Sequence, residues 1–285
     1  MDEKLLNASP LLVIGMHRSG TRLLDEILGG LGVFMGADRQ ADGESVTFML
    51  INEAIFQQCG TFWNEPMPVH YVLSDESFLA RATGIARAAL TTYLPGYKGA
   101  NSPLDETTEM LPPFGWKDPR NTFTLPAWKQ IFPNLRVIHV LRHGVDVAAS
   151  LSRRHGAALR EATGESVPPA LTVIRDHSLG VMSSRRGWNV SEAFTMWDQY
   201  VEKTRLELAE AGESGLEIRF EELLQRPERL IAKIARFCGV PVPENPEGVF
   251  DRIDKSRALA YRQEPELSSF AETVGDVLSR HGYSP

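Results

Sequence analysis

Apolar and polar positions along the chain form blocks that predict strands separated by helices. Two short apolar runs, Leu11–Met16 and Leu135–Arg142, are typical of buried strands. Weaker strand patterns occur at Phe114–Pro119 and Gly215–Phe220, and a long amphipathic pattern over Val190–Ala211 predicts a helix. Strands that alternate with helices favour an α/β fold, in which a mostly parallel central sheet is covered by helices on both faces.

Helical spacing of apolar residues also predicts the remaining helices. They are expected over 21–32, 44–58, 75–94, 125–132, 144–155 and 227–240. Pro95 and Gly96 are expected to end the helix over 75–94, because proline removes a helical hydrogen bond. No repeat divides the chain, so we expect one domain over residues 1–285, with lid or acceptor-binding insertions at about 61–113 and 156–188.

Composition narrows the class of protein. The formal net charge of −7 gives no general affinity for nucleic acid or for an anionic membrane, so any basic site must be local. Cys59 and Cys238 are the only cysteines, which is too few for a disulfide framework and lacks the spacing of a zinc site. The first ten residues carry acids and do not resemble a signal peptide, and no apolar run reaches the roughly 20 residues of a membrane helix. We therefore expect a cytoplasmic protein.

The loop after the first predicted strand has the glycine spacing of a phosphate-binding P-loop. However, Thr21 stands where the ATP-binding lysine is expected, and Arg22 replaces the hydroxyl that holds magnesium. The second strong strand ends in Arg142 and not in a magnesium-binding aspartate. The loop therefore predicts an anion site without a metal, in which Arg18 and Arg22 supply positive charge. The alternative is a plain strand–turn–helix unit with solvated arginines.

A second anion clamp is predicted at the end of the strand 135–142. Arg142 ends this strand, and Ser150 follows it within the next predicted helix. Ligands collect at the carboxyl ends of parallel strands, so Arg142 and the opening loop are expected to face one crevice. Alone, Arg142 is equally explained as an ion-pair partner of Asp146. Together, the two clamps predict a ligand with phosphates at both ends of a nucleoside.

Four segments resemble, in order, those of sulfotransferases that use 3′-phosphoadenosine 5′-phosphosulfate (PAPS). They are GMHRSGTRLL, GWKDPRNTFTLPAW, VIHVLRHGVDVAAS and IRFEELLQRPERLIAKIARFCGVP, and together they span about Leu11 to Pro243. Arg18 stands where cytosolic phenol and steroid sulfotransferases have lysine, which is closer to the glycan and protein-tyrosine enzymes. His143-Gly144 replaces the usual Asp-Pro, and the C-terminal R-K-G-x-x-G segment of the family does not occur.

The resemblance implies a P-loop-like three-layer fold, PAPS as donor and metal-free transfer of the sulfuryl group to a hydroxyl or amine. The acceptor would be a carbohydrate or small metabolite, and the product of the donor would be adenosine 3′,5′-bisphosphate. Neither nucleic acid nor a membrane is expected as a partner. The residues expected to bind the donor are His17, Arg18, Ser19, Gly20, Thr21, Arg22, Arg142, Ser150, Phe220 and Arg257.

Transfer to an alcohol needs a base for the hydroxyl proton and cations for the leaving oxygen. Arg18 and Lys117 are the expected cations. Glu44 is the leading candidate for the base, Asp118 competes with it, and His17 is a third option. An acid at the start of a helix also simply complements the helix dipole. Two other classes stay open, a P-loop small-molecule kinase and a non-catalytic nucleotide-binding protein of the same fold.

Overall fold

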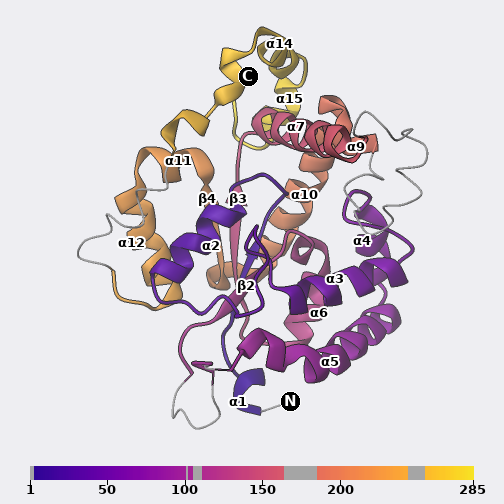
Figure 1. Cartoon of the computed structure of the whole chain (residues 1–285), viewed down its shortest axis with the longest axis vertical. Coiled ribbons are helices and arrows are strands. Elements are labelled where there is room, and N and C mark those ends of the chain that lie inside the picture. Colours follow the sequence, from indigo (N-terminus) through magenta and orange to yellow (C-terminus); the bar gives the residue numbers. More distant parts are fainter. Residues whose placement is uncertain (1–2, 101, 105–110, 164–184, 243–253) are drawn as a thin grey trace.

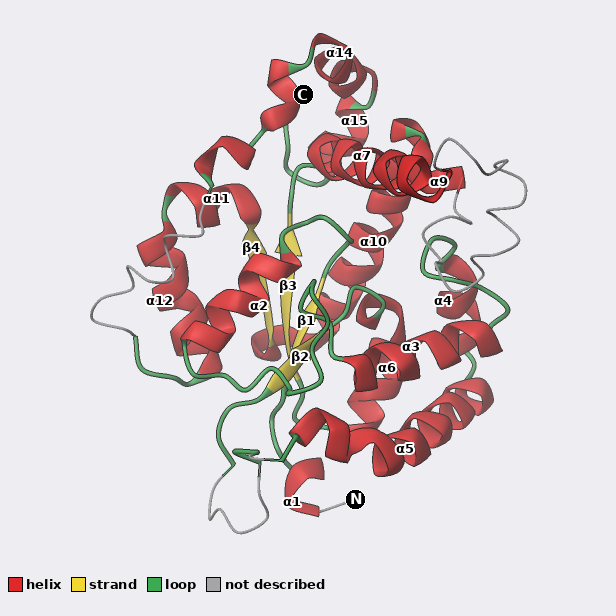
Figure 2. Ribbon diagram, in the orientation of Figure 1, coloured by secondary structure: helices red, strands yellow, loops and turns green. Residues whose placement is uncertain are grey.

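The protein is built around one parallel sheet. The computed structural model describes residues 3–100, 102–104, 111–163, 185–242 and 254–285. Four strands lie in the order β2–β1–β3–β4 and all pair in parallel (Figure 2). They are β1 (Leu11–Ile14), β2 (Gly115–Lys117), β3 (Arg136–Leu141) and β4 (Gly215–Arg219). Each lies where the hydrophobic pattern predicts a strand, so the α/β prediction is confirmed.

Helices cover both faces of this sheet, as expected (Figure 1). Leu12 and Ile14 of β1 face one hydrophobic core, and Leu11 and Val13 face the other, because successive side chains of a strand point to opposite faces. One core is completed by α2 (Thr21–Gly30), α11 (Phe220–Gln225) and α12 (Pro227–Cys238). The other is completed by α3 (Val46–Gln58), α5 (Glu76–Lys98), α6 (Asn121–Ile131), α7 (Gly144–Thr163) and α10 (Val190–Ala211).

Smaller elements complete the fold. They are α1 (Glu3–Leu6), α4 (Met67–Leu73), α9 (Arg185–Trp188), η1 (Gly212–Ser214), η2 (Lys255–Arg257), η3 (Ala260–Gln263), α14 (Pro265–Thr273) and α15 (Gly275–Arg280). The C-terminal elements lie beside α7 and the end of β3 (Figure 1). Of the two expected insertions, residues 101 and 105–110 of the first and residues 164–184 of the second lie outside the described residues. In the first, Val69 of α4 and Leu90 of α5 belong to the same core as the sheet.

The prediction that Pro95 ends its helix is wrong. Helix α5 continues through Pro95 to Lys98, and the amide of Gly99 donates to the Pro95 carbonyl at 2.9 Å. A proline in the last turn removes only one helical bond, a loss that tertiary contacts can offset. Here Tyr97 is fully buried, and its hydroxyl donates to the carbonyl of Gly115 in β2 at 2.7 Å. This anchor holds the last turn against the sheet.

Candidate active site

The loop between β1 and α2 is shaped by backbone that few residues can adopt. Gly15 has φ 134°, and a Cβ there would lie 2.8 Å from the Val140 carbonyl oxygen. Gly20 has φ 102°, and a Cβ there would lie 2.3 Å from the Phe220 ring. Arg18 takes a left-handed conformation with φ 72°. No side chain caps the start of α2 after Gly20. The first amides of α2 therefore have no side-chain cap, as is common at helix starts that bind anions.

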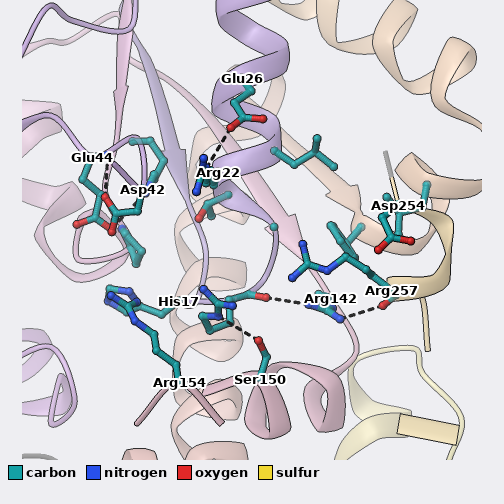
Figure 3. A pocket seen from close by; sticks show the side chains of 18 residues that line it. His17, Arg22, Glu26, Asp42, Glu44, Arg142, Ser150, Arg154, Asp254 and Arg257 are labelled. Carbon is teal, nitrogen blue, oxygen red and sulfur yellow. Dashed lines mark hydrogen bonds and ion pairs between the residues drawn. The ribbon is translucent and has the colours of Figure 1, made fainter. Parts of the chain in front are cut away.

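Arg142 lies against this loop at the end of β3, where the sequence predicts it (Figure 3). Its Nη1 donates to the Arg18 carbonyl at 3.2 Å, and its Nη2 donates to the Arg257 carbonyl at 2.9 Å. Its guanidinium carbon lies 4.7 Å from the centre of the Phe220 ring, and Asp146 is 3.5 Å away. Arg142 thus joins the opening loop to η2, and it also makes the Asp146 ion pair that the sequence left as an alternative.

Arg18 extends from the loop to α7, where its Nε donates to the Ser150 hydroxyl at 3.0 Å. Burial lowers the pKa of Arg18, and four nearby guanidinium groups, those of Arg154, Arg257, Arg142 and Arg22, lower it further. Repulsion of this kind is common where a site is prepared for an anion. Sequence reasoning missed Arg154, although it stands four residues after Ser150 and therefore on the same face of α7.

These groups line a cavity of about 560 Å³ at the carboxyl edge of the sheet (Figure 3). Of the residues expected at the site, the cavity is lined by His17, Arg18, Gly20, Thr21, Arg22, Glu44, Lys117, Arg142, Ser150, Phe220 and Arg257. Ser19 and Asp118 are buried and do not line it. A second cavity of about 520 Å³, beside η2 and η3, shares Arg18, Arg142, Ser150, Arg154 and Arg257.

Glu44 lies at the opposite end of the cavity from Arg257 (Figure 3). It immediately precedes Ser45, the N-cap of α3, and only 4 % of the residue is exposed. One carboxylate oxygen is 3.2 Å from Lys117 Nζ, and the other is 3.3 Å from Arg120 Nη1. Lys117 comes from the end of β2, and Arg120 from the start of α6. The two cations fix both oxygens of Glu44 at the cavity wall.

The competing carboxylate, Asp118, faces the protein interior. It accepts hydrogen bonds from Asn52 Nδ2 at 2.8 Å and from Arg120 Nη1 at 3.0 Å. Burial raises the pKa of Asp118 to about 6, although the Arg120 guanidinium favours the charged form. Of the two acids weighed as the base, only Glu44 lines the cavity.

His17 lines the cavity in surroundings that disfavour its charged form. It packs edge-on against Trp63, with ring centres 4.5 Å apart. Burial lowers its pKa well below the usual range, and the charges of Arg120, Arg154 and Lys117 act in the same direction. Within the described parts of the chain, no cluster of three or more His, Cys, Asp or Glu residues is arranged to hold a metal ion. The helices described there include none that is long and apolar enough to span a membrane.

The fold is P-loop-like, and a cavity lined by five arginines and Lys117 lies at the carboxyl edge of its parallel sheet, where ligands collect in such folds. The profile described as the sulfotransferase family matches residues 10–244. The chain therefore belongs to the sulfotransferase family, and it is an enzyme of that class. This confirms the family predicted from the four sequence segments.

Solved structures agree on the fold. The sulfotransferase domain from the curacin biosynthetic pathway shares 15 % identity with the chain at a TM-score of 0.52, covering 98 % of this chain and 99 % of that one. The sulfotransferase from Alicyclobacillus acidocaldarius shares 14 % identity at a TM-score of 0.54, covering 96 % and 94 %. Sulfotransferase STF9 from Mycobacterium avium shares 12 % identity at a TM-score of 0.50, covering 95 % and 75 %. No curated protein shows significant similarity to the chain.

Proposed function

We propose that the protein transfers the sulfuryl group of PAPS to a hydroxyl or amine of a carbohydrate or small metabolite. Adenosine 3′,5′-bisphosphate is the second product. One observation carries the proposal: the Arg142 guanidinium bonds to the carbonyl of Arg18, so the two anion clamps lie at one cavity. Membership of the sulfotransferase family implies the same donor. The cytoplasmic location expected from the sequence stays a prediction.

The cavity residues suit the two ends of this donor. We assign the 5′-phosphosulfate to the first amides of α2 and to Arg18, and the 3′-phosphate to Arg142, Ser150 and Arg257. Phe220 supplies an apolar ring for the adenine. The buried Nε of Arg142 has no partner within the described residues, and a ligand oxygen would remove the cost of leaving it unpaired.

The transfer step assigns roles to Arg18 and to the polar groups around Glu44. Lys117 and Arg18 stabilise the negative charge that develops on the leaving phosphate oxygen. Glu44 accepts the proton of the acceptor while the acceptor oxygen or nitrogen bonds to sulfur and the bond from sulfur to the bridging oxygen breaks. Lys117 and Arg120 hold the carboxylate in place for this role. Asp118, which lies behind the cavity wall, positions Arg120.

Calorimetry with the full chain tests the donor assignment. With EDTA present, we expect adenosine 3′,5′-bisphosphate to bind at micromolar concentration and adenosine 5′-phosphate at least tenfold more weakly, since it lacks the 3′-phosphate. Binding of neither nucleotide at millimolar concentration would overturn the proposal. Tighter binding of ATP with magnesium than of the bisphosphate would instead support a small-molecule kinase.

Labelled PAPS tests the transfer itself. Incubated with a mixture of sugar and phenol acceptors, the wild-type protein should give labelled acceptor and an equal amount of the bisphosphate. Tight binding of the bisphosphate without any transfer across the acceptors would support the non-catalytic alternative.

A further inference from the structure

Arg154 is a cation of the cavity that the donor assignment leaves unused. It is an exposed residue of α7, and its side chain extends toward His17 (Figure 3). Its neighbour Arg153 forms an ion pair with Glu264 at 2.7 Å. For Arg154, no ion pair with an acid occurs within the described residues. The two adjacent arginines therefore differ: one is neutralised by the protein, and the other is left for another partner.

The surroundings of Arg154 are themselves positive. Burial lowers the pKa of Arg18 most, and the charge of Arg154 is the next largest cause. The same charge also lowers the pKa of His17. Several guanidinium groups that line one cavity favour an anion there, because their positive potentials add. The position of Arg154 at the cavity wall therefore suits a negative group of a ligand.

Within the first cavity, Arg154 lies away from Arg257 and toward Glu44. Arg257 and Asp254 lie on one side of Arg142 in Figure 3, whereas Arg154 reaches the opposite side, beside His17. That side also carries Glu44, to which we assign the acceptor proton (Figure 3).

We propose that Arg154 binds an anionic group of the acceptor, so that the acceptor substrates of this enzyme carry a phosphate, sulfate or carboxylate in addition to the reacting hydroxyl or amine. This inference rests on the proposed function and specifies its acceptor class. Arg154 is thus a specificity residue. The rival role is a third arginine of the donor clamp, since Arg154 also lines the second cavity with Arg142, Ser150 and Arg257, the residues assigned to the 3′-phosphate.

Calorimetry on the protein saturated with adenosine 3′,5′-bisphosphate separates these roles. The probes are glucose 6-phosphate, glucose 6-sulfate and glucuronate, and glucose is the neutral control. We expect at least one anionic probe to bind about tenfold more tightly than glucose. This is the gain in affinity expected from one charge-assisted hydrogen bond. Arg154→Gln should reduce that probe to the affinity of glucose. Arg153→Gln is the control at the neighbouring position. Arg153 lines the second cavity but not the first, where the acceptor is placed, so this variant should leave all four affinities within about twofold.

Three results would overturn the inference. The first is that no anionic probe binds better than glucose to the wild-type complex. The second is that Arg154→Gln leaves the anionic preference intact. The third is that this variant weakens binding of the bisphosphate itself tenfold or more, which would place Arg154 in the donor clamp. Failure of the wild-type protein to bind the bisphosphate is a separate result and refutes the proposed function.

Discussion

The two ends of the cavity balance their charges in different ways. Around Glu44, each buried charge has an opposite charge within the protein: Lys117 and Arg120 contact Glu44, and Arg120 also contacts Asp118. At the other end, Arg18 and Arg142 contact mainly neutral groups, although the exposed Arg22 pairs with Glu26 at 3.0 Å. Arg18 donates to the Ser150 hydroxyl, and Arg142 donates to two main-chain carbonyls besides its ion pair with Asp146.

Because of this difference, we expect the two ends of the cavity to have different functions. A group that handles a proton must keep a fixed position before the substrate arrives, and buried ion pairs with both oxygens of Glu44 provide that fixation. A group that binds phosphate must keep its charge available, and most of the hydrogen-bond partners of Arg18 and Arg142 are neutral groups, which a phosphate can outcompete. We expect the first end to contribute to the stability of the free protein and the second end to contribute chiefly when the donor is bound.

The largest effect is expected for Glu44→Gln. The amide cannot accept the proton, so the turnover number should fall by roughly 100-fold to 10,000-fold. It also leaves buried Lys117 without its countercharge, whereas Arg120 keeps Asp118 and Glu53, and the loss should lower the free energy of unfolding by about 3 kcal/mol. Steady-state sulfuryl transfer and urea unfolding measure the two losses.

The matched control for this variant is Glu53→Gln. Glu53 also contacts Arg120, at 3.0 Å, but it is 40 % exposed and does not line the cavity. Its loss should change turnover less than about threefold. Equal losses for both variants would show that Glu44 acts only through the position of Arg120.

Arg142→Ala should weaken binding of adenosine 3′,5′-bisphosphate by about 100-fold, because it removes a guanidinium that makes charge-assisted bonds. Arg142→Lys keeps the charge without the fork and should lose about tenfold. Calorimetry measures the affinity of both variants for the bisphosphate. The control is Arg280→Ala, at an exposed position of α15. Unchanged affinity in both Arg142 variants would contradict the second anion clamp.

A smaller effect is expected in the pH dependence of stability. The pKa of Asp118 is about 6 in the folded protein because of burial, above its usual value near 4 when unfolded. The folded state therefore binds this proton more tightly, and its stabilising effect is complete below about pH 4 and is lost as the pH rises through 6.

Relative to Asp118→Asn, the wild-type protein should thus become progressively less stable between pH 4 and pH 6. The difference in unfolding free energy between the two proteins, measured in urea at each pH, isolates this carboxyl from the others. If this difference stays constant over the range, or grows in favour of the wild type, the raised pKa of Asp118 is refuted.

The smallest effect is expected for Arg18→Gln without ligand. The variant loses a hydrogen bond to Ser150 but also removes repulsion from four neighbouring arginines, so the free energy of unfolding should change by less than about 0.5 kcal/mol. With saturating bisphosphate the wild type should gain clearly more thermal stability than the variant. A large loss of unfolding free energy without ligand would mean that Arg18 stabilises the free protein. That result would contradict the proposed difference between the two ends of the cavity.

Local patterns predicted much of the site. The loop from Gly15 to Thr21 and the strand that ends in Arg142 were recognisable because glycine spacing and apolar runs have direct backbone consequences. The choice between Glu44 and Asp118 could not be made from the sequence, because both acids stand beside elements that reach the cavity edge. Which of them faces the cavity depends on how α3 and α6 pack together.

The amino-acid sequence by itself determined the alternation of strands and helices, the family, and the chemical types gathered at the strand ends, since each depends on short-range periodicity or on motifs in order. Tertiary structure alone decided the partners of the charges. It turned Asp118 inward, pinned Glu44 between two cations and left Arg154 beside His17. Pairing of charges depends on distances between residues far apart in the chain, and those distances exist only once helices and sheet are packed.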